Sequence, residues 1–175
     1  MNSKKELLEI YDKRGNYLGL LERSECHKNP EIAHKAVHVL VFNSKLELLL
    51  QKRSNKKELY PDHWDTSVGG HLMPGETYLE AAIRECLEEL GFKPENLNFL
   101  YSYRANFPNE TELVETYYTI FDGPYNFSNS QEVSEVKSFS LEELFLLKDM
   151  AGFSPYFLVE LKHLKEHLNK TGGIR

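Results

Sequence analysis

Three acidic residues, Glu85, Glu88 and Glu89, stand three and four positions apart in a segment with helical periodicity. At this spacing their carboxylates lie on one flank of a helix, where like charges repel one another. A solvated acidic helix face is the common explanation of such a cluster. The preceding segment, 69–76, contains three glycines and a proline. Its backbone can therefore turn sharply and bring a fourth carboxylate, that of Glu76, against the start of the helix.

Carboxylates that converge from a loop and a helix form an all-oxygen site. Mg²⁺ and Mn²⁺ prefer such ligands and often share their coordination with substrate phosphates. The cluster therefore predicts chemistry at a diphosphate, with Mg²⁺ as the cofactor and Mn²⁺ as a possible substitute. We expect Glu85, Glu88 and Glu89 to be the metal ligands. Arg84 is expected to orient a carboxylate through a forked ion pair, and Glu76 to support the helix start or act through water.

The helix that carries this cluster is predicted for residues 77–90. Thr77 and Glu80 form a capping box, and Gly91 suits the left-handed conformation that ends many helices. The apolar residues that share one face predict its buried stripe: Leu79, Ala82, Ile83, Cys86 and Leu90. Cys86 is therefore expected to be a core residue.

Paired apolar runs around short turns predict three hairpins. The pairs are 7–11 with 17–21, 36–42 with 46–50, and 99–107 with 113–121 around the turn Pro108-Asn109-Glu110, and 136–139 adds a further strand. Two more helices are expected, one from the Ser140 capping box to about 148 and one from Ser154-Pro155 to 168. This order of elements predicts one α+β domain over 1–175 with a mixed sheet, an N-terminal hairpin at about 1–30 and C-terminal helices at about 140–170.

The composition limits the classes of partner that the protein can be expected to bind. The 175 residues carry a formal charge of −6, which disfavours broad attraction to nucleic acids or anionic membranes. The charged N-terminal segment and the short apolar runs predict neither a secretory signal nor a membrane span. Two cysteines are too few for a disulfide framework. We expect a cytoplasmic protein whose partner is a small diphosphate molecule, with a homodimer as a possible assembly.

The stretch 70–92 resembles a complete Nudix box. Gly70 is followed after five residues by Glu76, and after seven more by Arg84-Glu85-Cys86-Leu87-Glu88-Glu89-Leu90-Gly91-Phe92. Every fixed position of the pattern is filled, with Gly70, Glu76 and Gly91 in structural roles. The resemblance implies a Nudix-type α/β/α sandwich and a Mg²⁺-dependent hydrolase of a diphosphate compound, with a nucleoside diphosphate or a derivative as the leading substrate class. It also implies Glu89 or Glu115 as the general base, because Nudix proteins use either a box glutamate or one from elsewhere.

Other stretches, 41–43, 48–53, 64–71 and 153–156, resemble the isopentenyl-diphosphate isomerase branch of the same superfamily. In that branch, histidines and a glutamate outside the box hold a divalent metal. The resemblance implies His27, His34, His71 and Glu115 as such ligands and Arg53 and Lys57 as contacts to the substrate diphosphate. Trp64, Tyr103 and Tyr156 are candidate aromatic walls of the substrate pocket. His38, which alternates with valines, is expected to be a structural strand residue.

Two departures from the isomerases separate the alternatives. Their catalytic cysteine lies two residues before the loop histidine, and this sequence has Gly69 there. The isomerases also have a degraded Nudix box, whereas this box is intact. Both differences favour hydrolysis. The alternatives are an isoprenoid-diphosphate isomerase, a prenyl-diphosphate hydrolase, and a non-catalytic ligand sensor on the same fold.

Overall fold

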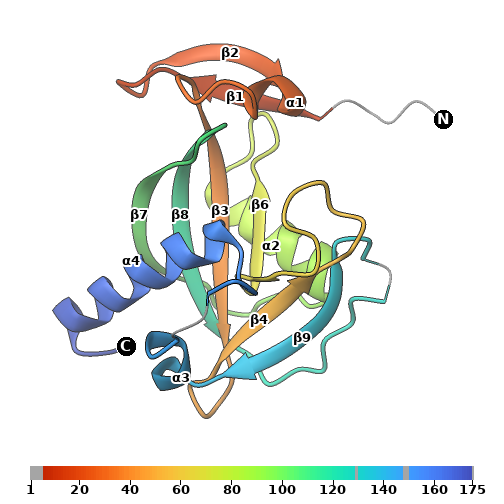
Figure 1. Ribbon diagram of the computed structural model, residues 1–175, viewed down its shortest axis with the longest axis vertical. Helices are drawn as coiled ribbons and strands as arrows, with labels where there is room; N and C mark the ends of the chain where they lie inside the picture. Colours follow the sequence, from red (N-terminus) through yellow and green to blue (C-terminus); the bar gives the residue numbers. More distant parts are fainter. Residues whose placement is uncertain (1–5, 129, 148–149, 175) are drawn as a thin grey trace.

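The computed structural model describes residues 6–128, 130–147 and 150–174, and its strands form one mixed sheet around β3 (Figure 1). The strands are β1 (Leu7–Tyr11), β2 (Tyr17–Glu22), β3 (Ala33–Phe42), β4 (Leu48–Arg53), β5 (Trp64–Asp65), β6 (Val68–His71), β7 (Asn98–Asn106), β8 (Thr111–Ile120) and β9 (Val133–Phe139). The helices are α1 (Arg23–Cys26), α2 (Tyr78–Leu90), α3 (Leu141–Phe145) and α4 (Pro155–Thr171).

The pairing of the central strand β3 divides the sheet into two parts. β8 runs parallel to β3 along its whole length, from Ala33 opposite Thr111 to Phe42 opposite Ile120. The other edge of β3 is shared in turn by β1 at its start, β6 along 36–39 and β4 at its end. β4 then continues the sheet through β5 and β9, away from β6. The mixed sheet expected from the sequence is confirmed.

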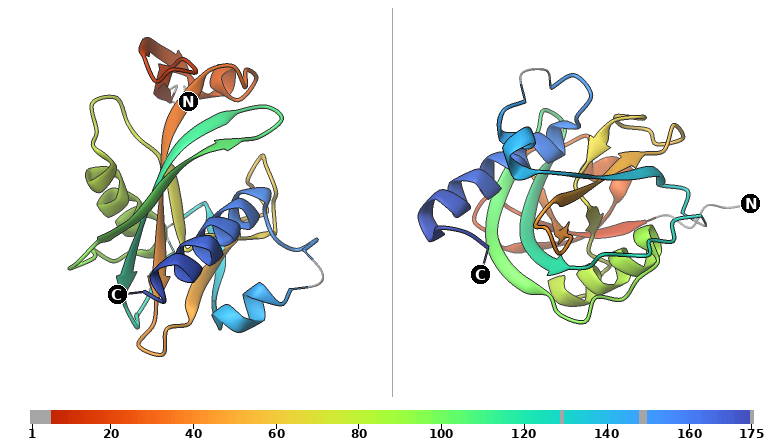
Figure 2. Two further views of the ribbon diagram at one scale, coloured as in Figure 1. Left: turned by 90° about the vertical axis from the view of Figure 1, so that its left-hand side faces the viewer. Right: turned by 90° about the horizontal axis from the view of Figure 1, so that it is seen from below.

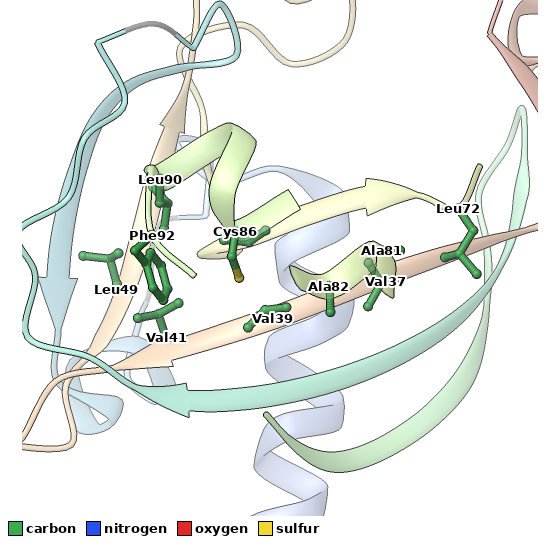
Figure 3. Packing of buried hydrophobic residues seen from close by; sticks show 11 residues of the cluster. Val37, Val39, Val41, Leu49, Leu72, Ala81, Ala82, Cys86, Leu90 and Phe92 are labelled. Carbon is green, nitrogen blue, oxygen red and sulfur yellow. The ribbon is translucent and has the colours of Figure 1, made fainter. Parts of the chain in front are cut away.

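Two helices cover opposite faces of the central strands, α2 on one face and α4 on the other (Figure 2). Residues of β3 alternate between them, because successive side chains of a strand point to opposite faces. Val37, Val39 and Val41 pack under α2 (Figure 3), whereas Leu40 and Phe42 join the core beneath α4.

The ends of α2 agree with the sequence. Thr77 and Glu80 form a reciprocal capping box, and Gly91 ends the helix in the left-handed conformation with φ of 69°. A Cβ atom at Gly91 would lie 2.3 Å from the backbone oxygen of Asn126, so no other residue fits there without a shift. Ser140 and Ser154 cap α3 and α4 as predicted.

The predicted buried stripe of α2 is partly wrong. Ala82, Cys86 and Leu90 are buried, but Leu79 is 47% exposed and Ala81 takes its place against the sheet. Glu89 also lies on this inward side and is only 4% exposed. The helix is therefore rotated so that part of its acidic flank faces the protein rather than the solvent.

The three predicted hairpins are confirmed as β1–β2, β3–β4 and β7–β8. The short helix α1 and the strands β5 and β6 were not predicted from the sequence. Gly69, Gly70 and His71 were expected in a loop, yet these residues pair with β3 as part of β6. Glycines disfavour strands in general, so the pairing of β6 depends on β3 rather than on local preference. No helix in the described ranges is both long and apolar enough to cross a membrane.

Candidate active site and metal centre

A cleft of about 320 Å³ opens between β6, β4 and the N-terminal segment. Its walls come from residues distant in the sequence, including β1, α2, the start of β8 and the start of α4. Two groups of side chains of types that can bind metals lie at it. One is the acidic flank of α2 (Glu85, Glu88 and Glu89), which lines the cleft. The other, which we call the histidine cluster, consists of His27, His71, Glu110 and Glu112, which line the cleft, and His34, which is buried beside them.

The backbone of β6 is the floor on which the α2 carboxylates rest. A Cβ atom at Gly70 would lie 2.1 Å from Oε1 of Glu85, so the absence of a side chain there admits this carboxylate. The amide of Gly69 donates a hydrogen bond of 3.2 Å to Oε2 of Glu89, and Nε2 of Gln51 donates one of 2.8 Å to the same oxygen. Two strands thus position Glu89 at the base of the cleft.

Burial changes the acidity of these carboxyl groups. It raises the pKa of Glu85 to about 7, against the opposing charge of Arg84. It also raises the pKa of Glu89 well above its ordinary value, with the negative charge of Glu85 adding to the effect. Glu88 is more open, with 55% of its side chain exposed. Burial disfavours the charged form of these carboxyl groups, and a cation bound beside them would offset that cost.

Arg84 links the acidic residues as the sequence predicts. Its Nε and Nη2 atoms donate to the two carboxylate oxygens of Glu76 at 2.8 and 2.9 Å, which is a forked ion pair. Its Nη1 atom donates to Glu85 at 2.5 Å and to Glu88 at 3.2 Å. Nη2 also donates to the backbone oxygen of His71 at 3.0 Å, which ties α2 to the end of β6. Glu76 therefore holds Arg84 and, through it, the acidic flank.

The histidine cluster brings together one residue after α1, one on β3, one at the end of β6 and two at the start of β8. A ligand atom from each of His27, His34, His71 and Glu110 lies within 4.8 Å of the others. Nε2 of His27 and Nε2 of His34 lie 3.0 and 3.7 Å from Oε2 of Glu110. Glu112 approaches from the other side, with Oε1 3.7 Å from Nε2 of His71.

Within the part of the chain that the structure describes, several polar atoms of the histidine cluster are buried without a partner in hydrogen-bond geometry: Nε2 of His27, both ring nitrogens of His34, Oε2 of Glu110 and Oε2 of Glu112. Leaving such atoms unpaired is costly, which is why buried polar groups are almost always satisfied. Burial and the charge of His71 also lower the pKa of His34 to about 2, so this ring stays in the neutral form that a metal binds. Three imidazoles with carboxylates suit a divalent transition metal, and the residues fit such an ion.

Glu115, expected as a ligand or general base, does not reach the cleft. It lies on the face of β8 that α2 covers, where the hydroxyl of Tyr117 donates to Oε2 at 2.7 Å. Glu110 takes the expected position beside the histidines instead. Side chains two apart on a strand share a face, so Glu112 joins Glu110 at the cleft while Glu115 points away. The expectation for Glu115 is therefore corrected.

The expected substrate contacts divide into two groups. Arg53, Lys57 and Tyr156 all line the cleft. Arg53 is held by Asp65 at 2.9 Å, and Lys57 is paired with Glu132 at 2.6 Å. The hydroxyl of Tyr156 donates to Glu110, and the neighbouring His27 and this hydroxyl outweigh the effect of burial and lower the pKa of Glu110 to about 2.

Trp64 and Tyr103 do not form walls of the cleft. Trp64 packs against Phe139 in the core beneath α4, with ring centroids 5.5 Å apart. The hydroxyl of Tyr103 donates to Glu160 at 2.7 Å, and its ring stacks on His163. Both residues support the fold behind the cleft.

Four further residues that line the cleft were not predicted from the sequence as functional candidates: Gln51, Glu110, Glu112 and Glu132. The spacing of Glu110 and Glu112 after a turn was an available signal, because residues two apart at a strand start share a face. The contacts of Gln51 and Glu132 depend on which strands pair, and no local pattern shows that pairing.

Comparison with known proteins agrees with this architecture. The NUDIX domain model matches residues 33–161, and the chain belongs to the Nudix family. An uncharacterized Nudix hydrolase of Listeria innocua is 37% identical over 142 residues, covering 77% of this chain and 82% of the relative.

An isopentenyl-diphosphate delta-isomerase of Streptomyces griseus is 31% identical over 172 residues, covering 95% of this chain and 87% of the isomerase. The crystal structure of DR0079 from Deinococcus radiodurans superposes with a TM-score of 0.76 at 26% identity, covering 91% of this chain and 98% of that protein. The chain is therefore similar to both hydrolases and isomerases of this family.

Proposed function

We propose that this protein is a Mg²⁺-dependent hydrolase that cleaves a diphosphate linkage in a small molecule, with a nucleoside diphosphate or one of its derivatives as the leading substrate class. The observation that carries the proposal is the acidic flank of α2, whose three carboxylates line the cleft and whose innermost member, Glu89, is only 4% exposed. Glu85, Glu88 and Glu89 are the proposed ligands of the cation, for which Mn²⁺ is an alternative. The histidine cluster is proposed to hold a second divalent ion, of the transition-metal type that imidazoles favour.

In the proposed reaction, water attacks phosphorus, the bridging P–O bond breaks, and the phosphate of the leaving portion departs with the bond electrons. A bound divalent ion supplies neutralisation of phosphoryl charge and a lowered pKa for water. Glu89 accepts the proton of the attacking water. The hydrogen bonds from Gln51 and Gly69 hold its carboxylate in place for this role. Arg53 and Lys57 provide positive charge along the same cleft.

The histidine cluster and the similarity to isomerases support a second candidate, isomerisation or hydrolysis of an isoprenoid diphosphate. Isomerisation requires a proton donor and acceptor at carbon, and Gly69 provides no side chain at the position of the isomerase cysteine. The intact acidic flank supports hydrolysis more directly. A non-catalytic sensor is disfavoured because every carboxylate of the box is present.

A substrate panel separates these candidates. The protein is incubated with Mg²⁺ and nucleoside diphosphates, nucleoside triphosphates, sugar nucleotides or isopentenyl diphosphate, while phosphate release and isomer formation are followed. We expect hydrolysis without isomer formation. Formation of the allylic isomer without phosphate release would instead identify an isomerase.

Glu89→Gln tests the proposed base. We expect turnover to fall by at least about 10², the scale of losing a general base, with little change in thermal stability. Glu95→Gln, at an exposed position outside the cleft, is the matched control and should keep full activity. Undiminished turnover in Glu89→Gln would remove this residue from the mechanism.

A further inference from the structure

His38 extends from the centre of β3 into the wall of the cleft. It lies opposite Gly69 in the β3–β6 pairing. A Cβ atom at Gly69 would lie 3.1 Å from Cδ2 and 3.6 Å from Nε2 of His38. The missing side chain at residue 69 therefore leaves the space into which this imidazole fits, on the face of β6 opposite to the one that admits Glu85 at Gly70.

Glu160 on α4 fixes the orientation of the ring. Its Oε2 atom lies 2.7 Å from Nδ1 of His38, and the hydroxyls of Tyr103 and Thr116 donate to the same oxygen at 2.7 and 3.0 Å. Tyr101 donates to the other carboxylate oxygen at 2.5 Å. Glu160 is fully buried, and these four side chains hold its carboxylate away from solvent.

The other ring nitrogen, Nε2, has no hydrogen-bond partner among the residues that the structure describes. Since Nδ1 is held by Glu160, Nε2 is the atom that turns toward Gly69 and the cleft. Purely structural histidines of a core commonly have both nitrogens satisfied. A ring oriented by a buried carboxylate with its second nitrogen free is instead the arrangement that presents a donor to a ligand.

We propose that His38 is a substrate-contacting residue, whose Nε2–H donates to a phosphoryl oxygen of a diphosphate bound in the cleft, and that Glu160 is its positioning residue. This inference rests on the proposed function. The amide of Gly69 donates to Glu89, and His38, Gly69 and Glu89 all line the same cleft, so the imidazole shares this space with the acidic flank. It adds a hydrogen-bond donor to a cleft otherwise lined by many carboxylates.

The electrostatics agree with this arrangement. Burial by itself lowers the pKa of His38, but the hydrogen bond and charge of Glu160 outweigh it, and the pKa is raised. Glu112 and Asp65 add to this effect from the start of β8 and from β5. The doubly protonated ring, which donates from both nitrogens, is therefore more favoured here than in a free histidine.

The test uses the full-length protein with Mg²⁺ and methylenediphosphonate, a diphosphate analogue with a bridge that water does not cleave. Histidine side chains labelled with ¹⁵N are observed by NMR during titration, and affinity is measured by calorimetry. We expect the Nε2 signal of His38 to shift on binding. His38→Asn should weaken binding by at least about 10-fold, the effect of losing one charged hydrogen bond. His167→Asn, on the part of α4 near Tyr101, is the matched control and should bind as the wild type does.

Glu160→Gln tests the positioning role separately. In the free protein it should move the Nδ1 and Nε2 signals of His38 toward those of a neutral ring, which a merely structural role would not do. If the analogue binds while the Nε2 signal stays in place and His38→Asn keeps its affinity, the inference is wrong and the proposed function stands. If the analogue does not bind the wild type at all, the proposed function fails and the inference fails with it. If His38→Asn does not fold, the wild-type titration alone decides.

Discussion

The contact between Gly70 and Glu85 shows how the Nudix box works at the scale of single residues. The glycine is required for space, because its hypothetical Cβ atom would overlap the Glu85 carboxylate. Arg84 then holds Glu85 against Glu76 and Glu88, so the box is a chain of contacts and not a set of separate ligands.

Gly70→Ala should therefore lower activity without unfolding the protein. The added methyl group forces Glu85 out of its position, and we expect Mg²⁺ affinity or turnover to fall by about 10- to 100-fold, as when a residue that supports a ligand is removed. Phosphate release at several Mg²⁺ concentrations measures the effect. Gly152→Ala is the control, because nothing lies within 4 Å of a Cβ atom there. Equal activity of the two variants would contradict the role assigned to Gly70.

Residue spacing predicted the acidic flank and the Arg84 fork because these contacts lie within one helix and the turn before it. It could not decide between Glu110 and Glu115. That choice depends on which face of β8 meets the cleft, because successive side chains of a strand point to opposite faces. A shift of one position in the pairing reverses the assignment.

At the scale of elements, α4 is joined to β3 by the buried pair of His38 and Glu160. The sequence predicted α4 from its cap and periodicity, but it interpreted His38 as a structural strand residue and gave no sign of its partner. The two residues are 122 positions apart, and local patterns carry no information about such a contact. α2, in contrast, was predicted with its ends because its caps are local.

The buried pair predicts a pH-dependent contribution to stability. Because the pKa of His38 is raised in the folded protein, its contribution to the free energy of unfolding is complete below pH 6.5, its ordinary pKa. This contribution is lost as the pH rises through the raised pKa. The pKa of Glu160 is lowered, because hydrogen bonds from His38 and two tyrosines outweigh the effect of burial. The contribution of Glu160 to the free energy of unfolding is therefore complete above pH 4.5 and is lost at lower pH. The pair therefore stabilises most between 4.5 and 6.5.

Urea unfolding of Glu160→Gln measures this contribution. We expect the variant to be less stable by about 3 kcal/mol at about pH 5.5, as for one broken member of a buried ion pair, with a smaller difference at about pH 8.5. Glu166→Gln, on the exposed side of α4, is the control. A difference that does not change with pH would show that the pair is not ionised.

At the scale of the whole molecule, the cleft exists because β3 shares one edge among β1, β6 and β4. This arrangement brings residues 27, 34, 71 and 110 together at one end and the acidic flank of α2 to the same opening. The Nudix fold and the mixed sheet were predictable from the order of elements and the box. The complete ligand set was not, because the parallel pairing of β3 with β8 places residues together that are about 80 positions apart.

The central claim is that the acidic flank of α2 holds a divalent cation against a diphosphate. Crystals grown with Mn²⁺ and methylenediphosphonate test it most directly, since the anomalous signal of manganese locates the ion. We predict a manganese peak in contact with the carboxylates of Glu85 and Glu89 and with the analogue. A fully bound analogue with no manganese at these carboxylates would contradict the account.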